Sequence, residues 1–370
     1  MKITRISAWK VELPIDHGGF RWSGGGLRAF DSTVVRIETD EGITGWGEVC
    51  PLGPTYLPAY GEGVRAGIRQ MAPSLVGSDP TRLSVVNARM DAALKGHPYV
   101  KSGIDIACWD ILGKVAGLPV CSLLGGKHGD AVLLHRAISQ DAAATMAAGV
   151  SDFRAQGYRR FQLKLGGRPQ EDVDRIQQVV AVLEPGDTLI GDANGAWLMH
   201  EAAQVLPAMQ EVSALVSTYL EQPCRTYEEC LSIRRRTALP FILDESIDAV
   251  GPLVRAYGDA AMDAVNLKIS KLGGLTRAAR ARDLCVELGV AMIIEDSSGG
   301  DVATAAVTHL AHSTPEGCRF ASTDLNGYVT RKYAEGAPLR EDGRLMASDA
   351  PGLGVAPYLE ELGQPSIEIE

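Results

Sequence analysis

Six successive apolar segments between residues 161 and 295 each end in a charged residue, and this repeated feature is what most constrains the fold. The segments close at Lys164, Asp192, Glu221, Asp244, Lys268 and Glu295. Each is followed by a polar loop and a helical stretch, and the spacing of 23 to 29 residues between charged ends matches one strand–helix unit of a barrel. A weaker segment at 132–134 is the expected first strand, and one near Phe320 the last.

The residues before this repeat follow a different pattern. Residues 1–13, 32–38 and 43–49 alternate apolar and polar positions and predict antiparallel strands. Residues 64–71, 83–94 and 102–116 have helical periodicity, and the last of these ends at a glycine followed by a proline. We therefore expect an α+β domain over 1–126, a barrel over 127–336, and a C-terminal segment, 337–370, that packs back on the first domain.

Carboxylates at the strand ends predict a metal site. The carboxyl ends of barrel strands converge on one mouth, where active sites lie. Asp192, Glu221 and Asp244 close three consecutive strands, and oxygen ligands of this kind suit Mg²⁺. Helix capping or pairing with arginines is the alternative, whereas zinc would require a His or Cys cluster that the sequence lacks.

Lys164 and Lys268 close strands on either side of these acids. Burial, Mg²⁺ and a second ammonium are expected to lower the pKa of such lysines, so that one serves as a base and its protonated partner as an acid. The alternative role is to neutralise a metal ligand. With Mg²⁺ on a bound carboxylate, the pair predicts abstraction of the proton α to that carboxylate.

These residues resemble the enolase superfamily, in its muconate-lactonizing-enzyme-like branch (the mandelate racemase/muconate lactonizing enzyme family). The resemblance lies in the segments TDEGITGWGE, SGIDIACWDILGKVAGLPVCSLLGG, FQLKLG, GDANGAW, LEQP, LDES and NLKISKLGG. It implies a (β/α)7β-type TIM barrel with an N-terminal α+β capping domain, Mg²⁺ on the three acids, catalytic Lys164 and Lys268, and a homo-oligomer. Glu295 stands where the mandelate-racemase-like branch would place a histidine.

The same resemblance implies two loops that cover the barrel mouth. Residues 16–30 are the expected lid and 50–60 a second flap, from which Trp22 and Tyr56 would close on the substrate. Asn194, in the GDANGAW segment, is also assigned to substrate binding.

Acidic residues near the last two strands predict a pocket for a cationic group of the substrate, such as an α-ammonium. They are Glu295, Asp296 and Asp324. The segment WGEVCPLGPTY and the GGD at 299–301 resemble members of the family that act on proline betaines and hydroxyprolines.

Four functions follow from these features. The first is a racemase or epimerase of an amino-acid derivative, with proline-like derivatives among the candidates, because two lysines on opposite faces suit 1,1-proton transfer. The second is a dehydratase of a hydroxylated amino acid, such as a hydroxyproline, or of a sugar acid. A cycloisomerase is third, and a non-catalytic binding barrel is the alternative of another class.

Composition limits the partners. The net charge of −10 disfavours nucleic acid, which requires a basic surface, so a small-molecule carboxylate is the expected partner. No apolar run has the length of a signal sequence or a membrane helix, and the seven cysteines are without CxxC spacing. We therefore expect a cytoplasmic protein with reduced thiols and no membrane partner.

Overall fold

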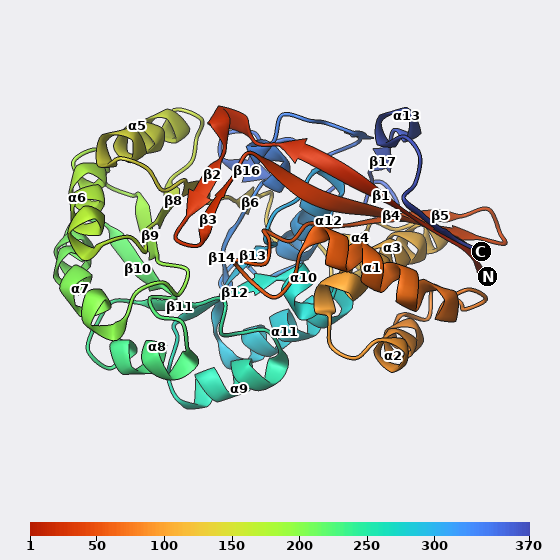
Figure 1. The fold of residues 1–370 in the computed structure, drawn as a ribbon, viewed down its shortest axis with the longest axis horizontal. Coiled ribbons are helices and arrows are strands. Elements are labelled where there is room, and N and C mark those ends of the chain that lie inside the picture. The colour runs from red at the N-terminus through yellow and green to blue at the C-terminus, as the bar shows by residue number, and fades with distance from the viewer.

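The computed structural model describes residues 1–370 and contains a capping domain beside a barrel (Figure 1). The capping sheet is antiparallel and has the strand order β18-β1-β4-β5. Its elements are β1 (Ile3–Pro14), β4 (Ala29–Thr39), β5 (Thr44–Val49) and β18 (Ile367–Ile369), covered by α1 (Gly61–Met71), α2 (Leu83–Ala93) and α3 (Pro98–Ala116). The strands and helices predicted for this domain are therefore confirmed, each within a few residues.

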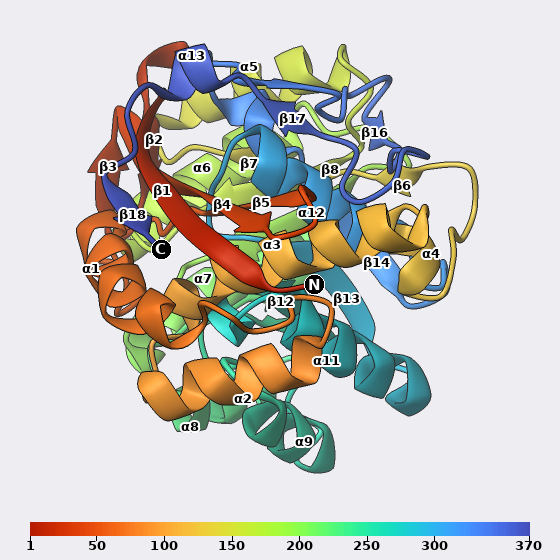
Figure 2. The same cartoon turned by 90° about the vertical axis from the view of Figure 1, so that its right-hand side faces the viewer.

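Both faces of the capping sheet are buried, as the two-residue period of its strands requires. Trp9, Val11 and Leu13 of β1 join the apolar core that continues into the barrel. Ile6 and Ala8 belong to a second core beneath α1, α2 and α3. One face of the sheet thus packs toward the barrel, and α3 adds contacts of its own, because Trp109 and Asp105 bind Thr276 of α11 (Leu275–Leu288). In Figure 2, α1, α2 and α3 lie below the strands of this sheet.

Eight parallel strands form the barrel sheet, in chain order from β7 to β14. They are β7 (Arg136–Ile138), β8 (Arg160–Lys164), β9 (Thr188–Asp192), β10 (Ser217–Glu221), β11 (Phe241–Leu243), β12 (Ala264–Lys268), β13 (Ala291–Glu295) and β14 (Arg319–Ser322). A parallel bridge between Leu134 and Ser322 joins the first strand to the last. This is the TIM-type barrel with a capping domain that the sequence predicts.

Helices follow each of the first seven strands, which gives the (β/α)7β order. They are α5 (Ala143–Arg154), α6 (Pro169–Val180), α7 (Met199–Ser213), α8 (Tyr227–Arg234), α9 (Val250–Gly258), α10 (Ile269–Leu272) with α11 (Leu275–Leu288), and α12 (Asp301–His312). In Figure 1, α5 to α9 surround the strands on the side away from the capping domain, whereas α10 and α12 lie beside that domain.

The prediction for the first barrel strand was wrong. Val132 and Leu133 form β6, which pairs antiparallel with β16 (Arg344–Leu345) outside the barrel. The barrel strand is β7, which begins at Arg136 directly after His135, and both of these residues are buried. Apolar character marks a strand without telling which sheet it joins, and these polar residues concealed the true one.

Short elements connect these two domains. The segment before β4 folds into a hairpin of β2 (Phe20–Trp22) and β3 (Gly25–Leu27). The remaining elements are α4 (Val120–Leu123), β15 (Ala334–Glu335), β17 (Ala356–Pro357) and α13 (Leu359–Leu362). Beyond them, β18 pairs with β1, so the C-terminus ends in the capping sheet beside the N-terminal strand.

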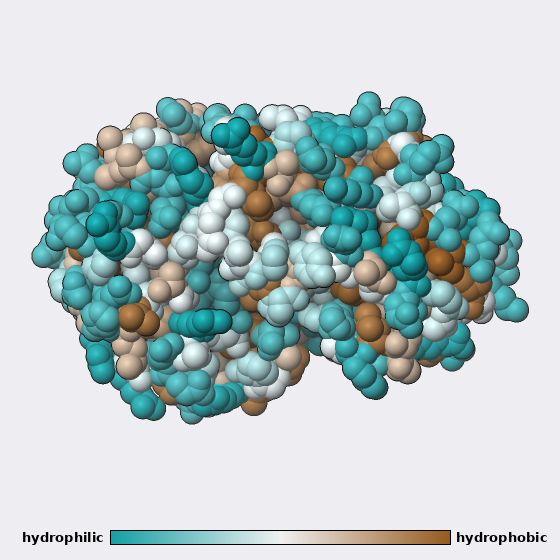
Figure 3. Space-filling model, in the orientation of Figure 1, coloured by the Kyte–Doolittle hydropathy of each residue, from teal (hydrophilic) through white to brown (hydrophobic).

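The surface is mainly hydrophilic on the face seen in Figure 3, where hydrophobic residues form small separate patches. No helix combines the length and the apolar character needed to cross a membrane.

Candidate active site

The charged strand ends meet at the carboxyl end of the barrel. Lys164, Asp192 and Glu221 are the last residues of β8, β9 and β10, and they are register partners across these neighbouring strands. Asp244 directly follows β11. All three carboxylates are fully buried, so their position in the sequence translates into one acidic cluster inside the barrel.

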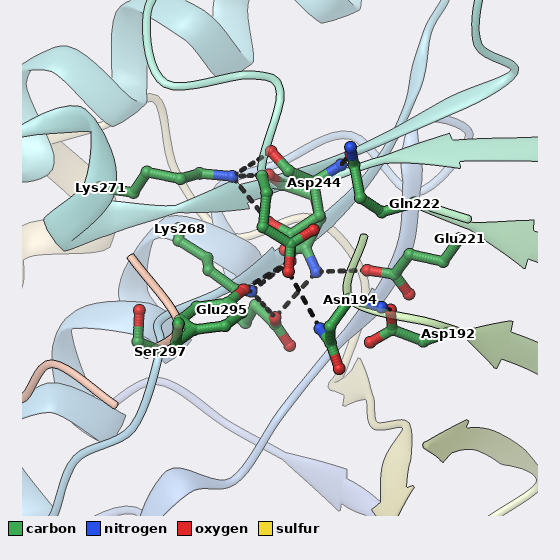
Figure 4. A network of polar contacts seen from close by, with 12 residues as sticks. Asp192, Asn194, Glu221, Gln222, Asp244, Lys268, Lys271, Glu295 and Ser297 are labelled. Atoms are coloured by element: carbon green, nitrogen blue, oxygen red, sulfur yellow. Dashed lines mark hydrogen bonds and ion pairs between the residues drawn. The ribbon is translucent and has the colours of Figure 1, made fainter. Parts of the chain in front are cut away.

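Ammonium groups approach this cluster from two sides. Lys164 Nζ lies 2.5 Å from Asp192 Oδ2, while Lys268 donates to Asp244 Oδ2 and to the Tyr56 hydroxyl. Lys164 and Lys268 lie four strands apart in an eight-stranded barrel, so they face each other across its axis. Figure 4 shows Lys268 beneath Asp244, between it and Glu295.

The pKa of each of these lysines differs from the expectation. Burial lowers both, but the charges of Asp192 and Glu221 outweigh it and raise the pKa of Lys164. Asp244 and Glu295 likewise raise the pKa of Lys268 well above its ordinary value. The prediction of lowered values counted burial, Mg²⁺ and a second ammonium; the carboxylates in contact with the amines act in the opposite direction, and a divalent cation bound among them would offset that effect.

The surroundings of Glu221 disfavour the charged form of its carboxylate. Burial raises its pKa well above the ordinary value, and the neighbouring Asp192 and Asp244 raise it further. Gln162 Nε2 donates to Glu221 Oε2 at 2.7 Å and Asn266 Nδ2 to Oε1 at 3.0 Å. Such a carboxylate is stabilised in its charged form by any cation placed among the three acids.

The three buried carboxylates provide the kind of oxygen ligands that Mg²⁺ prefers. Asp192, Glu221 and Asp244 offer hard oxygens from adjoining strands, and their mutual repulsion favours a divalent cation. No three acidic, His or Cys side chains are gathered closely enough in this structure to enclose a metal ion. Lys271 Nζ also donates a hydrogen bond to Asp244 Oδ1 at 2.7 Å, so this oxygen has a protein partner.

A cavity of about 60 Å³ lies over the lysines. Both lysines line it, together with aromatic residues from the capping domain and barrel residues that include Phe20, Trp22, Tyr56, His135, Asn194, Glu295, Asp296 and Tyr328. Its walls are thus apolar toward the cap and charged toward the barrel.

Five of the six predicted substrate-binding residues line this cavity: Trp22, Tyr56, Asn194, Glu295 and Asp296. Asp296 turns its carboxylate to Ser270, whose backbone N–H donates at 3.0 Å and whose hydroxyl donates at 2.6 Å. Burial raises the pKa of Asp296 to about 6. By contrast, Lys268 and His135 overcome burial and lower the pKa of Glu295 to about 2.

Asp324 is the predicted residue that the structure does not bring to the cavity. Its Oδ1 accepts from the Tyr158 hydroxyl at 2.7 Å, and its Oδ2 pairs with Arg340 at 2.8 Å. Both oxygens are committed to these partners, so we leave Asp324 out of the proposed site.

The lid expected over 16–30 contacts the barrel loops. Arg21 donates its backbone N–H to Ser139 Oγ at 2.8 Å and accepts from the backbone of Gln140 at 2.9 Å. Ser23 Oγ donates to the backbone oxygen of Ala193 at 3.0 Å. These contacts hold the β2–β3 hairpin against the loops that follow β7 and β9.

Several residues at the site escaped the sequence analysis: His135, Gln162, Asn266 and Lys271. Gln162, Asn266 and Lys271 lie within the strand-end segments, where an amide or a second amine inside a buried apolar run was the available signal. Asn266 Nδ2 donates to Glu295 Oε1 at 2.8 Å as well as to Glu221, so it joins the end of β10 to the end of β13.

Comparison with known proteins places this architecture in one family. Residues 13–125 match the family model described as "Mandelate racemase / muconate lactonizing enzyme, N-terminal domain", and residues 145–362 match "Enolase C-terminal domain-like". A cis-3-hydroxy-L-proline dehydratase from Roseibium aggregatum is 53% identical over 366 residues, 99% of each chain. An N-succinyl-L-Arg/Lys racemase from Bacillus cereus is 28% identical, over 96% of this chain and 95% of the other.

Solved structures agree. A mandelate racemase/muconate lactonizing enzyme from Roseovarius nubinhibens superposes with a TM-score of 0.95 at 41% identity, covering 100% of this chain and 98% of that one. A second protein of that description and organism, complexed with magnesium, gives 0.94 at 36% identity over 100% of both chains. This chain therefore belongs to the mandelate racemase/muconate lactonizing enzyme family of the enolase superfamily.

Proposed function

We propose that this protein is a magnesium-dependent dehydratase of a proline that carries a hydroxyl at C3, cis to the carboxylate. The observation that carries the proposal is one cavity lined by two lysines from opposite strands, Lys164 and Lys268. The similarity of 53% along the whole chain to a cis-3-hydroxy-L-proline dehydratase supports the substrate.

Asp192, Glu221 and Asp244 would hold the metal. When bound there, Mg²⁺ supplies positive charge that offsets the second negative charge developing on the substrate carboxylate as the α-proton leaves. Gln162 and Asn266 orient Glu221 for this task, because each donates a hydrogen bond to a different one of its oxygens.

The stereochemistry of the substrate fits the two lysines. In the cis isomer the hydroxyl lies on the ring face opposite the α-hydrogen, so elimination requires a base on one face and an acid on the other. One neutral lysine takes the α-proton, the C3–O bond breaks with its electrons on oxygen, and the opposite ammonium donates a proton to release water. The two lysines exchange protonation states, and the charges balance.

The walls of the cavity suit a ring of this kind. Phe20, Trp22 and Leu52 provide an apolar surface for ring methylenes, while Glu295 and Asp296 provide negative charge for the ring ammonium. The contacts of Arg21 and Ser23 hold the hairpin that carries Phe20 and Trp22 against the barrel loops beside this cavity.

Racemisation of an amino-acid derivative is the second candidate. Two facing lysines also suit removal of the α-proton from one face and its return from the other, and a racemase is among the relatives at 28% identity. Dehydration is preferred because the dehydratase is 53% identical over 99% of this chain, whereas the racemase is 28% identical over 96%.

Incubation in D₂O with Mg²⁺ separates the two. The protein should convert cis-3-hydroxy-L-proline to the cyclic imine that forms when the enamine product tautomerises, followed by NMR. L-Proline and N-succinyl amino acids serve as matched substrates without the C3 hydroxyl. Inversion with deuterium at the α-carbon, and no loss of water from the hydroxyproline, would replace dehydration with racemisation.

A further inference from the structure

His135 is a buried polar residue in the cavity that no step above uses. It precedes β7, its backbone N–H donates to Ser322 at 2.8 Å, and only 1% of the residue is exposed. It lines the same cavity as Lys164 and Lys268. Its ring Nε2 lies 3.3 Å from Glu295 Oε2.

The other ring nitrogen, Nδ1, is buried and has no hydrogen-bond partner. Buried polar atoms in folded proteins are rarely left unpaired, so such an atom within a substrate cavity is a candidate contact for a ligand. Because the Glu295 carboxylate can only accept, it favours the imidazole proton on Nε2. Nδ1 is then a neutral acceptor, suited to a hydroxyl or an N–H group.

The neighbours of His135 indicate which side of the substrate it serves. Glu295 joins it to Lys268, whose Nζ lies 3.5 Å from Glu295 Oε1. Lys164 lies across the barrel from Lys268, but its strand, β8, is the direct neighbour of β7. The contacts through Glu295 are therefore what associates His135 with Lys268.

We propose, resting on the function above, that His135 accepts a hydrogen bond from the C3 hydroxyl and makes the site selective for a hydroxylated ring. A charged ring nitrogen is better matched by the carboxylates of Glu295 and Asp296, which leaves the neutral acceptor for the hydroxyl. With its hydrogen directed to Nδ1, the hydroxyl oxygen presents a lone pair to the Lys268 ammonium. Lys164 then takes the α-proton from the other face, Lys268 protonates the departing oxygen, and water leaves.

This geometry makes His135 a specificity-determining residue and assigns the lysines their order. The competing role is structural: His135 would hold Glu295, and through Asn266 also Glu221, without touching substrate. Two substitutions separate these roles, because an asparagine amide overlays the position of Nδ1 and a glutamine amide reaches that of Nε2.

The test measures binding and turnover separately. Affinities of Mg²⁺-loaded protein for cis-3-hydroxy-L-proline and for L-proline are compared by calorimetry in a Lys164→Ala background, with and without His135→Gln or His135→Asn. Dehydration by each His135 variant is measured with Lys164 intact. Thermal unfolding of every variant checks that the fold is retained.

His135→Gln should lose about 10- to 100-fold in affinity for the hydroxylated ring, the cost of one unmade buried hydrogen bond, and similarly in kcat/KM. Its affinity for L-proline should stay within about twofold of the background, and His135→Asn should retain most of the preference. Equal loss for both ligands, or no loss in His135→Gln, would overturn the proposal. If unsubstituted protein dehydrates nothing, the proposed function fails, while the ratio of the two affinities still decides whether His135 recognises the hydroxyl.

Discussion

Glu48 joins the capping domain to the barrel, and its replacement tests how the two domains are held together. The carboxylate lies on β5, fully buried, and accepts four hydrogen bonds. Ser32 Oγ and Tyr333 Oη donate at 2.6 Å each, and the backbone N–H groups of Gly300 and Ala303 donate at 2.8 and 2.7 Å. The last two belong to the N-terminal end of α12, where a negative charge is favourable.

Glu48→Ala leaves all four donors without an acceptor. At about 1 kcal/mol each, the lower end of the cost of an unpaired buried donor, the loss of unfolding free energy is about 4 kcal/mol. Glu48→Gln is the matched control, because it keeps the shape and one acceptor oxygen and should lose about 2 kcal/mol. Urea unfolding followed by circular dichroism measures both. A loss below about 0.5 kcal/mol in the alanine variant, or equal losses in the two variants, would refute this reasoning.

The pH dependence of the stability difference between the native protein and Glu48→Gln gives a second check, and the sign of the change can be worked out. Burial raises the pKa of Glu48 above its ordinary value of 4.5, although Ser32 and Tyr333 oppose the shift. A carboxyl whose pKa is raised by folding contributes stability that is complete below the unfolded value and is lost as pH rises through the folded value. The advantage of the native protein over Glu48→Gln should therefore shrink as pH rises above 4.5.

Three further predictions concern the chemistry. Lys268→Ala should lose about 10²- to 10⁴-fold in dehydration of cis-3-hydroxy-L-proline but retain exchange of the L-proline α-proton with D₂O. Lys164→Ala should lose both the dehydration and the exchange. If each variant lost both activities, the proposed division of roles between the lysines would be contradicted. Mg²⁺ should raise the unfolding temperature of the native protein and not that of Glu221→Gln, because ligand binding stabilises only a site that binds it; equal shifts would remove Glu221 from the metal site. The trans-3-hydroxy isomer, whose hydroxyl shares a face with the α-hydrogen, should be dehydrated far more slowly than the cis isomer, and equal rates measured by NMR would exclude elimination between opposed lysines.

The sequence was sufficient to place the charged strand ends. Lys164, Asp192 and Glu221 could be predicted to meet because a parallel strand that is buried on both faces tolerates charge only at its end, and the ends of neighbouring strands lie in register. The strand–helix spacing then determined that the lysines on β8 and β12 face each other. Periodicity and burial cost together therefore gave the barrel and the acidic cluster.

The same rule does not tell where a side chain points. Asp324 follows β14 as the other acids follow their strands, but Tyr158 and Arg340 hold its carboxylate away from the cavity. His135 was missed for the opposite reason, since it precedes a short strand whose polar residues hid it. Both outcomes depend on contacts between residues that are more than a hundred positions apart or lie in irregular loops, which no local pattern encodes.

A chain of polar side chains lies inside the barrel below the lysines, and it gives the site an orientation. From Gln162 it runs through Glu221, Asn266 and Glu295 to His135. Because Asn266 donates to both Glu221 and Glu295, neither acid can turn without disturbing the other. In the proposed reaction, Glu221 would serve the metal that binds the substrate carboxylate, and His135 a neutral hydrogen-bonding group of the substrate. The unpaired Nδ1 of His135 is thus an acceptor at the second end of the chain, which a C3 hydroxyl would fill and a ring without a hydrogen-bonding group there would leave unpaired.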